Sequence, residues 1–264
     1  MGQVEKMEKI QIKKIKNHEI KLVEDMIVCE YPLTIFLNDE EFITLLCSPN
    51  GLKYLVVGFL ISEGIIKNKN EIEKLIIDEE KGYAYVDIKD KSSFSEKLFG
   101  KRTLTTGCAK GTVFYHVLDS FGTKKIDSPI RVKADKILEL SKKFNQASQL
   151  FKETGGVHSC ALCDEENILF LHEDVGRHNA LDKVIGEALL SDIRLDDKIL
   201  ISSGRISSEM ILKSTKNKIP MIVSRSAPTD LSVKIAKKFD VTLIGFARGN
   251  RMNIYHGEER LNII

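Results

Sequence analysis

Cys108 is the residue of this chain best suited to nucleophilic chemistry. It lies in the stretch TTGCAKG, residues 105–111, where glycines on both sides permit a partner to approach and Lys110 favours the thiolate. An exposed cysteine with a lowered pKa acts as a nucleophile, whereas a cysteine buried among apolar side chains is inert. One cysteine beside one lysine fits an ordinary loop thiol equally well, so the local pattern leaves both interpretations open.

The other cysteines favour packing over chemistry. Cys160 and Cys163 form a CxxC, which invites a zinc or redox interpretation. If residues 157–162 form a strand, however, positions three apart point to opposite faces, so the two thiols cannot readily share a metal or a disulfide. A second cysteine pair that would complete a structural zinc site is missing from the sequence. Cys29 and Cys47, in or beside predicted strands, are interpreted as small hydrophobic fillers.

The odd cysteine count also bears on the compartment. With 5 Cys in the chain, at least one thiol must remain unpaired and a complete disulfide framework is impossible. The reducing cytosol is the simplest compartment for such a protein.

Three predicted helix starts carry basic side chains. Residues 174–180 (DVGRHNA) contain Arg177 and His178, and residues 202–208 and 224–229 contribute Arg205 and Arg225 together with hydroxyls. The first turn of a helix offers free N–H groups and the positive end of the dipole, both of which attract anions. A capped helix start with a solvated arginine is the alternative for any one of them.

A basic turn follows the last predicted strand. The stretch GFARGNR, residues 245–251, provides two guanidiniums, a glycine for close backbone approach and an aromatic ring that can stack on a base. Its candidate ligand-binding residues are Phe246, Ala247, Arg248, Gly249, Asn250 and Arg251. Because arginine suits planar, bidentate recognition of phosphate, we favour an anionic, nucleotide-like ligand over a basic surface loop.

The elements that position these residues divide into two parts. The first part is predicted as α+β: a hairpin over residues 30–46 turning at Asn38-Asp39, a helix starting at residues 48–50 and stopping at Gly64, and a strand over residues 81–89. Residues 103–111 are predicted as a loop or turn of small residues. A linker is expected at residues 127–129.

The second part alternates helices and strands and predicts a layered α/β domain. A helix over residues 134–151 precedes paired strands at 157–162 and 168–172. Helices at 177–190, 207–216 and 229–239 then alternate with strands at 198–202, 221–224 and 241–246. Strands joined through helices are normally parallel with right-handed crossovers, so the loops that carry Arg205, Arg225 and Arg248 should share one edge of the sheet.

Composition narrows the class of protein. Of the 264 residues, 42% are hydrophobic and 30% charged, and 40 Lys+Arg against 38 Asp+Glu give a net charge of +2. These values exclude a strongly basic nucleic-acid arm, an acidic tail and a disordered chain. The longest apolar run, residues 55–61, is far shorter than the roughly 18 residues that cross a bilayer. No targeting segment is recognisable in residues 1–16, so a cytoplasmic protein without a membrane partner is expected.

The motifs, taken in order, resemble those of the formate dehydrogenase accessory sulfurtransferase family, FdhD. The resemblance runs through most of the chain, in the stretches EYPLTIFLNDEEFITLLCSP, GFLISEGI, TTGCAKG, TGGVHSCAL, DVGRHNALDKVIG, SGRISSEM, SRSAPTDLSVKIA and GFARGNRMNIY. It implies a carboxyl-terminal cytidine deaminase-like domain of three α/β/α layers, preceded by a smaller α+β domain. The expected boundaries are a charged amino-terminal tail at 1–16, the α+β domain with the Cys108 loop at 17–128, and the deaminase-like domain at 129–264.

The resemblance also implies a function. Members of the family receive sulfur from a cysteine desulfurase and pass it to the molybdenum cofactor before its insertion into formate dehydrogenase. In this chain the sulfur would be held on Cys108 as a persulfide. The cargo, bis(molybdopterin guanine dinucleotide), would bind at Phe246, Ala247, Arg248, Gly249, Asn250 and Arg251, with Arg205, Arg225 and His178 beside them. A homodimer is compatible with the resemblance, and neither a structural metal nor a nucleic-acid partner is expected.

One departure and two alternatives accompany this interpretation. Many relatives carry a second cysteine three positions after the carrier, but here that position is Gly111, so transfer would rely on Cys108 alone. A zinc deaminase is one alternative, although the His-x-Glu and the cysteine pair of such enzymes are missing from residues 178–180 and 204–208. The other is a non-catalytic chaperone that binds and delivers the cofactor, in which Cys108 would be dispensable.

Overall fold

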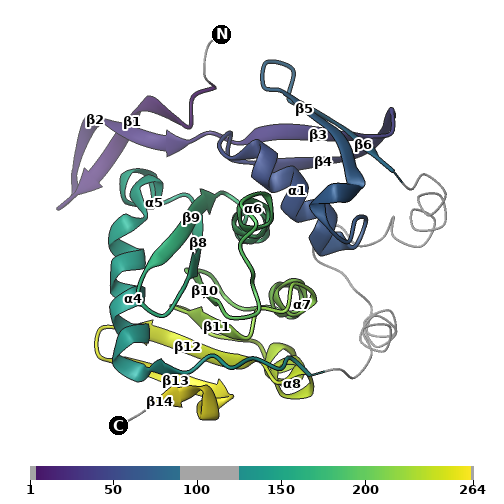
Figure 1. Ribbon diagram of the computed structural model, residues 1–264. Coiled ribbons are helices and arrows are strands. Elements are labelled where there is room, and N and C mark those ends of the chain that lie inside the picture. Colours follow the sequence, from purple (N-terminus) through teal and green to yellow (C-terminus); the bar gives the residue numbers. More distant parts are fainter. Residues whose placement is uncertain (1–3, 90–124, 263–264) are drawn as a thin grey trace.

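The computed structural model describes residues 4–89 and 125–262, which form a mixed α/β protein (Figure 1). It contains a two-stranded arm, a four-stranded sheet covered by one helix, and a six-stranded sheet with helices on both faces. The predicted fold class is therefore confirmed.

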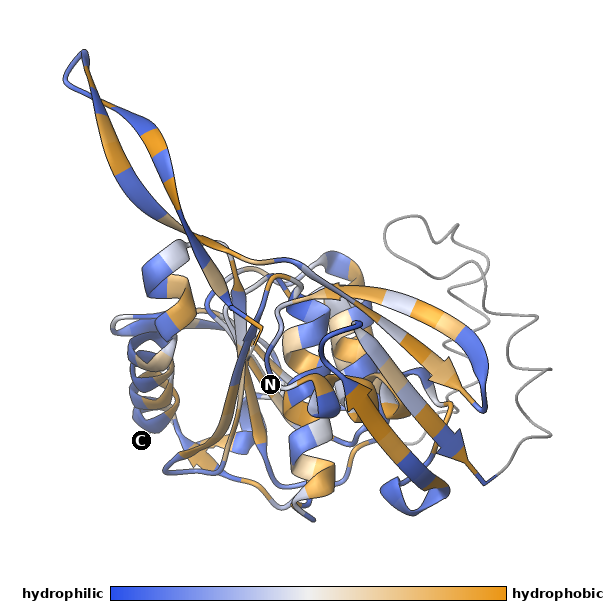
Figure 2. Cartoon of the chain, turned by 90° about the horizontal axis from the view of Figure 1, so that it is seen from above, coloured by the Kyte–Doolittle hydropathy of each residue, from blue (hydrophilic) through white to orange (hydrophobic). Residues whose placement is uncertain are grey.

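The arm is an antiparallel hairpin of β1 (Met7–Lys16) and β2 (Glu19–Val28) that projects from the body of the protein (Figure 2). Its two-residue turn places Asn17 and His18 at positive φ, which matches the twist of the flanking strands. Most of the segment expected as a charged tail, residues 1–16, is thus one strand of an arm.

The four-stranded sheet has the order β4-β3-β6-β5. The predicted hairpin is present as β3 (Tyr31–Leu37) and β4 (Glu40–Cys47), turning at Asn38 and Asp39, both at positive φ. β6 (Tyr83–Ile88) pairs in parallel with β3, and β5 (Ile72–Asp78), which lies outside the predicted elements, pairs with β6. A short 3₁₀ helix, Lys69–Glu71, leads into β5.

Helix α1 (Leu52–Glu63) joins the two parts of the protein. It begins after Gly51, slightly later than predicted, and ends at the predicted Gly64 in the left-handed conformation. One side packs on the four-stranded sheet and another on α6 (Arg177–Leu190), which explains why α1 is apolar almost all round. A Cβ added at Gly186 of α6 would lie 1.9 Å from the carbonyl oxygen of Tyr54, so the two helices cross with their backbones in contact.

The six-stranded sheet has the order β13-β12-β11-β10-β8-β9. Its strands β8 (His158–Cys163), β9 (Ile168–Asp174), β10 (Ile199–Ser202), β11 (Met221–Ser224) and β12 (Thr242–Arg248) match the predicted series. The pairs β10·β11 and β11·β12 are parallel, as expected, and β8 is antiparallel to β10. β13 (Arg251–His256), antiparallel to β12, was not anticipated.

The helices of this part form two layers around the sheet. α6, α7 (Ser208–Lys216) and α8 (Asp230–Phe239) cover one face, and α4 (Ala134–Ala147) covers the other. The predicted helix over residues 134–151 breaks at Ser148, and its last turn belongs to α5 (Gln149–Thr154). This α/β/α arrangement explains the CxxC: Cys160 packs in the core on the α6 side and Cys163 in the core on the α4 side. The two thiols therefore point to opposite faces, as the strand assignment predicted.

The remaining described segments are residues 125–131 and a small two-stranded sheet that includes the carboxyl-terminal strand. Residues 125–131, where the linker was expected, have no helix or strand, but Ile126 is buried and its N–H donates to the carbonyl of Phe239. β7 (Val132–Lys133) pairs with β14 (Leu261–Asn262), which follows the 3₁₀ helix Glu258–Arg260. No helix in the described ranges is long and apolar enough to cross a membrane.

Candidate functional site

One edge of the six-stranded sheet gathers most of the predicted binding residues. The carboxyl ends of β10, β11 and β12 lie side by side, with Ser202 opposite Ser224 and Val223 opposite Ile244. Because β8 is antiparallel to β10, its first residue, His158, lies at the same edge. β9 ends there as well and leads directly into the first turn of α6.

Backbone hydrogen bonds hold the loops of this edge together. The N–H of Arg225 donates to Ser202, and that of Phe246 donates to Ser226, at 3.0 and 3.1 Å. Ile206 links the loop that precedes α7 to the loop that precedes α8, because its N–H donates to the carbonyl of Ala227 and its carbonyl accepts from the N–H of Thr229. Arg205, Arg225 and Arg248 are therefore carried by loops that are fixed to one another.

Most hydroxyls of these loops serve the protein itself. Ser224 donates from Oγ to the carbonyl of Gly204 at 2.7 Å, and Ser203 accepts from the N–H of Ser159 at 2.9 Å. Ser207 and Thr229 cap α7 and α8, each accepting a backbone N–H in the first turn. The hydroxyls that were expected to donate to a phosphate therefore hold the loops in place. The arginine side chains of these loops are the groups that remain available to contact a ligand.

Arg225 and Arg248 form the centre of the site. Arg248, exposed at the end of β12, donates from Nε to the carbonyl of Arg225 at 2.5 Å. Arg225 is half-buried, and its pKa is lowered first by that burial and then by the positive charge of Arg248. The positive charges of the two arginines repel each other, and an anion bound to both would offset that repulsion.

The turn after β12 places the other predicted residues. Phe246 is half-buried and has a φ of 54°, an uncommon conformation for an aromatic residue, and Gly249 makes the turn at a φ of 56°. Asn250 and Arg251 are exposed, with Arg251 paired opposite Arg248. Ala247 differs from the rest, because its side chain is buried in the α4-side core and its carbonyl accepts from Ser141 Oγ. Its side chain cannot contact a ligand at the edge.

The start of α6 adds a second basic group to the edge. Its N-cap, Gly176, provides no side-chain cap, and Arg177 and His178 lie in the first turn. His178 Nε2 lies 3.1 Å from a carboxylate oxygen of Glu209 on α7. The Nε of Arg177 is buried without a hydrogen-bond partner among the described residues.

His158 belongs to the same group, although it is not among the predicted site residues. A Cβ added at Gly204 would lie 3.3 Å from His158 Nδ1 and 3.5 Å from the side chain of Arg177, so these three residues are adjacent. Burial, followed by the charges of Arg177 and His178, lowers the pKa of His158. The antiparallel pairing of β8 with β10 is the signal that would have placed it here.

The arginines of the edge are not neutralised by the described part of the protein. None of them takes part in an ion pair there; the set comprises Arg177, Arg205, Arg225, Arg248 and Arg251. By contrast, Arg194 and Arg260 both pair with aspartates. The edge therefore presents several positive charges that are unpaired in the described structure, and arginine forks suit bidentate contacts to phosphate.

The first and last residues of the DVGRHNALDK stretch, Asp174 and Lys183, stabilise the fold rather than face the sheet edge. Lys183 and Asp174 form a fully buried ion pair at 2.6 Å. Asp174 also accepts from the N–H of Ser48 and from Asn179, while Lys183 donates to the carbonyl of Ser48. This network ties the segment between β4 and α1 to the start of α6, so it connects the two parts of the protein.

Cys108, the predicted sulfur carrier, lies outside the described residues. The described cysteines are Cys29, Cys47, Cys160 and Cys163, and all are free thiols. Burial raises the pKa of Cys47, Cys160 and Cys163 to about 12 each, so none of these is a thiolate near neutral pH. Burial, followed by the charge of Glu8, also raises the pKa of Cys29.

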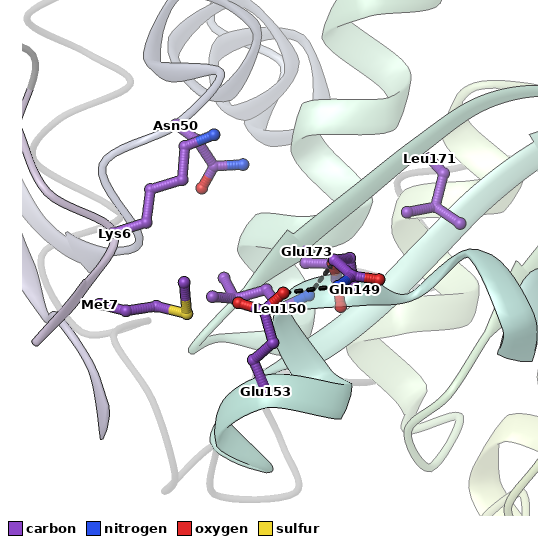
Figure 3. Close-up of a pocket in the computed structure, with 8 residues that line it drawn as sticks. All are labelled: Lys6, Met7, Asn50, Gln149, Leu150, Glu153, Leu171 and Glu173. Carbon is purple, nitrogen blue, oxygen red and sulfur yellow. Dashed lines mark hydrogen bonds between the residues drawn. The ribbon is translucent and has the colours of Figure 1, made fainter. Parts of the chain in front are cut away.

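A separate cleft of about 210 Å³ lies where the arm meets α5 (Figure 3). None of the predicted binding residues lines it. Its most buried acidic group, Glu173, accepts the N–H groups of Leu150 and Phe151, as Figure 3 shows for Leu150. This carboxylate therefore caps α5, and the cleft offers no comparable set of unpaired cations.

Among the described residues, no group of three or more His, Cys, Asp and Glu side chains could hold a metal ion. The zinc-deaminase alternative requires such a group at the starts of α6 and α7. Those positions hold His178, which faces Glu209, and the stretch of residues 204–208 without cysteine.

Comparison with known proteins relates most of the chain to one family. Residues 28–262 match the model of the FdhD/NarQ family. The "Sulfur carrier protein FdhD" of Bacillus pumilus (strain SAFR-032) is 47% identical over 90% of this chain and 90% of its own. That of Bacillus subtilis (strain 168) is 43% identical over 92% of this chain and 93% of its own.

A solved structure agrees. The "putative formate dehydrogenase accessory protein from Desulfotalea psychrophila" superimposes with a TM-score of 0.78 at 25% identity, over 97% of this chain and 99% of that one. The extent of these matches confirms the resemblance carried by the motifs. The chain belongs to the FdhD/NarQ family.

Proposed function

We propose that this protein is a sulfur carrier that serves formate dehydrogenase, accepting sulfur on Cys108 as a persulfide and passing it to the molybdenum cofactor. Relatives 47% and 43% identical over most of the chain are named sulfur carriers, and the superimposed structure is named a formate dehydrogenase accessory protein. The observation that carries the proposal for this chain is the sheet edge at which Arg177, Arg205, Arg225, Arg248 and Arg251 lie without ion-pair partners among the described residues.

The first step is sulfur transfer between two thiols. The thiolate of Cys108 attacks the outer sulfur of a persulfide on a cysteine desulfurase, a new S–S bond forms, and the desulfurase cysteine leaves as a thiolate. No net oxidation or reduction takes place in this exchange. Elimination supports Cys108, because the pKa values of the described cysteines are all raised and a raised pKa suppresses the attacking thiolate.

The cargo is bis(molybdopterin guanine dinucleotide), bound at the arginine-rich edge. Its phosphates would contact Arg225, Arg248 and Arg251, and the free N–H groups at the start of α6 would bind a further phosphate oxygen. Arg205 and His178 extend the same edge, and the ring of Phe246 is available to stack on guanine. Gly249 and Asn250 form the turn, whereas Ala247 anchors the end of β12 through its carbonyl, which accepts from Ser141 Oγ.

Replacing the carrier thiol separates this proposal from the chaperone alternative. Formate dehydrogenase activity would be measured in cells that lack the native protein and carry either the wild type or Cys108→Ser. Loss of activity with normal levels of the variant and unchanged binding of guanosine diphosphate supports sulfur transfer. Full activity of Cys108→Ser would show that the protein only binds and delivers the cofactor.

A further inference from the structure

Ser48 is a fully buried serine in the segment between β4 and α1, and it faces the other part of the protein. Its N–H donates to Asp174 Oδ2 at 3.0 Å, and its Oγ accepts the N–H of Val175 at 3.1 Å. Its carbonyl accepts from Lys183 Nζ at 3.0 Å. Three hydrogen bonds therefore attach Ser48 to the end of β9 and to α6.

Asp174 passes this attachment on to the start of α6. One of its carboxylate oxygens, Oδ2, contacts Ser48 and Lys183. The other, Oδ1, accepts the N–H of Gly176 at 2.8 Å and the side-chain amide of Asn179 at 2.9 Å. Gly176 is the N-cap of α6, and a Cβ there would lie 2.9 Å from Asn179 Nδ2, so this turn is tightly packed. The direction in which α6 begins is therefore set by Asp174, which Ser48 holds in place.

The first turn of α6 is the part of the sheet edge that offers backbone N–H groups to a ligand. The N–H of Ala180 donates to the carbonyl of Gly176 and begins the helical ladder, so the N–H groups of residues 177–179 have no partner within the helix. Such groups bind an anion when they point at it. A small rotation of this turn would direct them away from an anion held by Arg225 and Arg248.

Lys183 prevents the Asp174 carboxylate from opposing an anion. A negative charge beside the start of a helix interacts with the same positive dipole end as a bound anion and repels that anion. The ammonium of Lys183 lies 2.6 Å from Asp174, and both side chains are fully buried, so their opposite charges cancel. Asp174 can therefore shape the turn without weakening the binding of an anion there.

We propose that Ser48 is a positioning residue for the anion site of the sheet edge, acting through Asp174 on the start of α6. Ser48 itself cannot contact the ligand, because it is 0% exposed. The four-stranded part, which carries Ser48, packs on α6 through α1 (Figure 1). The two effects are reciprocal: docking of the two parts favours anion binding, and a bound anion strengthens the docking.

This inference rests on the proposed function, because it takes the sheet edge as the binding site for the phosphates of the cargo. Calorimetry of the full-length chain with guanosine diphosphate tests it. Ser48→Ala removes the acceptor for the N–H of Val175 and should lower the affinity about 10-fold, within the usual range of coupling between two sites. Ser214→Ala is the matched control and should bind like the wild type, since Ser214 is equally buried but its Oγ donates within α7. Circular dichroism confirms that each variant is folded.

Asn179→Ala makes the test independent of whether Ser48→Ala folds. The side-chain amide of Asn179 donates to Asp174 and to the carbonyl of Leu46, so its removal breaks a second link between the end of β4 and the start of α6. The affinity of this variant for guanosine diphosphate should fall as well. Wild-type affinity in the folded Ser48→Ala variant, or in Asn179→Ala if the first does not fold, would overturn the proposal.

Hydrogen exchange measures the reciprocal effect, which a serine that only stabilised the fold would not show. In the wild type, guanosine diphosphate should slow exchange in the peptide of residues 44–52 and leave β5, which belongs to the same sheet but lies outside the network, unchanged. Equal effects on both peptides, or no effect on either, would overturn the proposal while the binding site of the proposed function stands. A wild type that does not bind guanosine diphosphate would overturn both.

Discussion

The Nε of Arg248 donates a hydrogen bond to the backbone carbonyl of Arg225, across the loops that follow two neighbouring parallel strands. Neither arginine pairs with a carboxylate among the described residues. Burial first, and then the positive charge of Arg248, lowers the pKa of Arg225. A multiply charged anion bound to both arginines would offset the repulsion between their positive charges.

Removing one of these arginines should weaken nucleotide binding. Arg248→Ala and Arg251→Ala should each lower the affinity for guanosine diphosphate about 10- to 100-fold, because a charge-assisted hydrogen bond contributes about 1.5–3 kcal/mol. Calorimetry measures the change. Arg194→Ala, which removes an exposed arginine paired with Asp196, is the control and should bind like the wild type. Unchanged affinity in both edge variants would place the site elsewhere.

The buried pair of Asp174 and Lys183 predicts a large effect on stability. Lys183→Met leaves the Asp174 carboxylate buried without its cation and should lower the free energy of unfolding by about 3–5 kcal/mol. Adding Asp174→Asn should restore part of the loss, because the uncompensated charge is then gone. Urea denaturation of both variants checks this, and a single variant within about 0.5 kcal/mol of wild type would contradict the role assigned to the pair.

The crossing of α1 and α6 predicts that a single methyl group is destabilising. In Gly186→Ala the new Cβ would lie 1.9 Å from the carbonyl oxygen of Tyr54, so a backbone must move, at a cost of roughly 3 kcal/mol. Gly64→Ala is the comparison, since its Cβ would meet nothing within 4 Å and only the positive φ is strained, at about 1–2 kcal/mol. Equal melting temperatures for the two variants would argue against the tight crossing.

The raised thiol pKa values predict which cysteines react. With pKa values of about 12, Cys47, Cys160 and Cys163 are thiolates in only about one molecule in 10⁴ at pH 8, and each further pH unit raises that fraction tenfold. Iodoacetamide should therefore leave them unmodified in the folded protein at pH 8 and alkylate them after unfolding in guanidinium. Peptide mass spectrometry identifies the labelled residues. Rapid native labelling of Cys160 would show that its site is open to solvent.

The parts of the fold that have a local sequence pattern were predictable, whereas the parts that depend on contacts between distant residues were not. Helix α6 was predicted with its observed limits because apolar spacing and Gly176 mark it, and the parallel strands with the arginines at their ends followed from the helix–strand alternation. The arm was not predicted, because the even mixture of lysine and isoleucine in β1 carries no buried face to reveal a strand. Long-range contacts were equally hidden.

His158 and Glu209 illustrate that second limit. Neither residue stands in a spacing that indicates a ligand site, and both reach the edge only through the pairing of β8 with β10 and the packing of α7 on α6. The role of Asp174 and Lys183 depends in the same way on Ser48, more than a hundred residues earlier in the chain. Arg177 and His178 were recognisable from their residue types as candidate anion-binding residues. The structural role of Asp174 and Lys183 in the same stretch was not recognisable.

The central claim is that sulfur is carried on Cys108, and the most direct measurement is mass spectrometry of the protein after incubation with a cysteine desulfurase and cysteine. One added sulfur atom is expected, mapped to the peptide that contains Cys108 and removed by dithiothreitol, with no addition to the Cys108→Ser variant. A persulfide on Cys29 or another cysteine, or an unmodified Cys108 in a protein that still supports formate dehydrogenase, would contradict it.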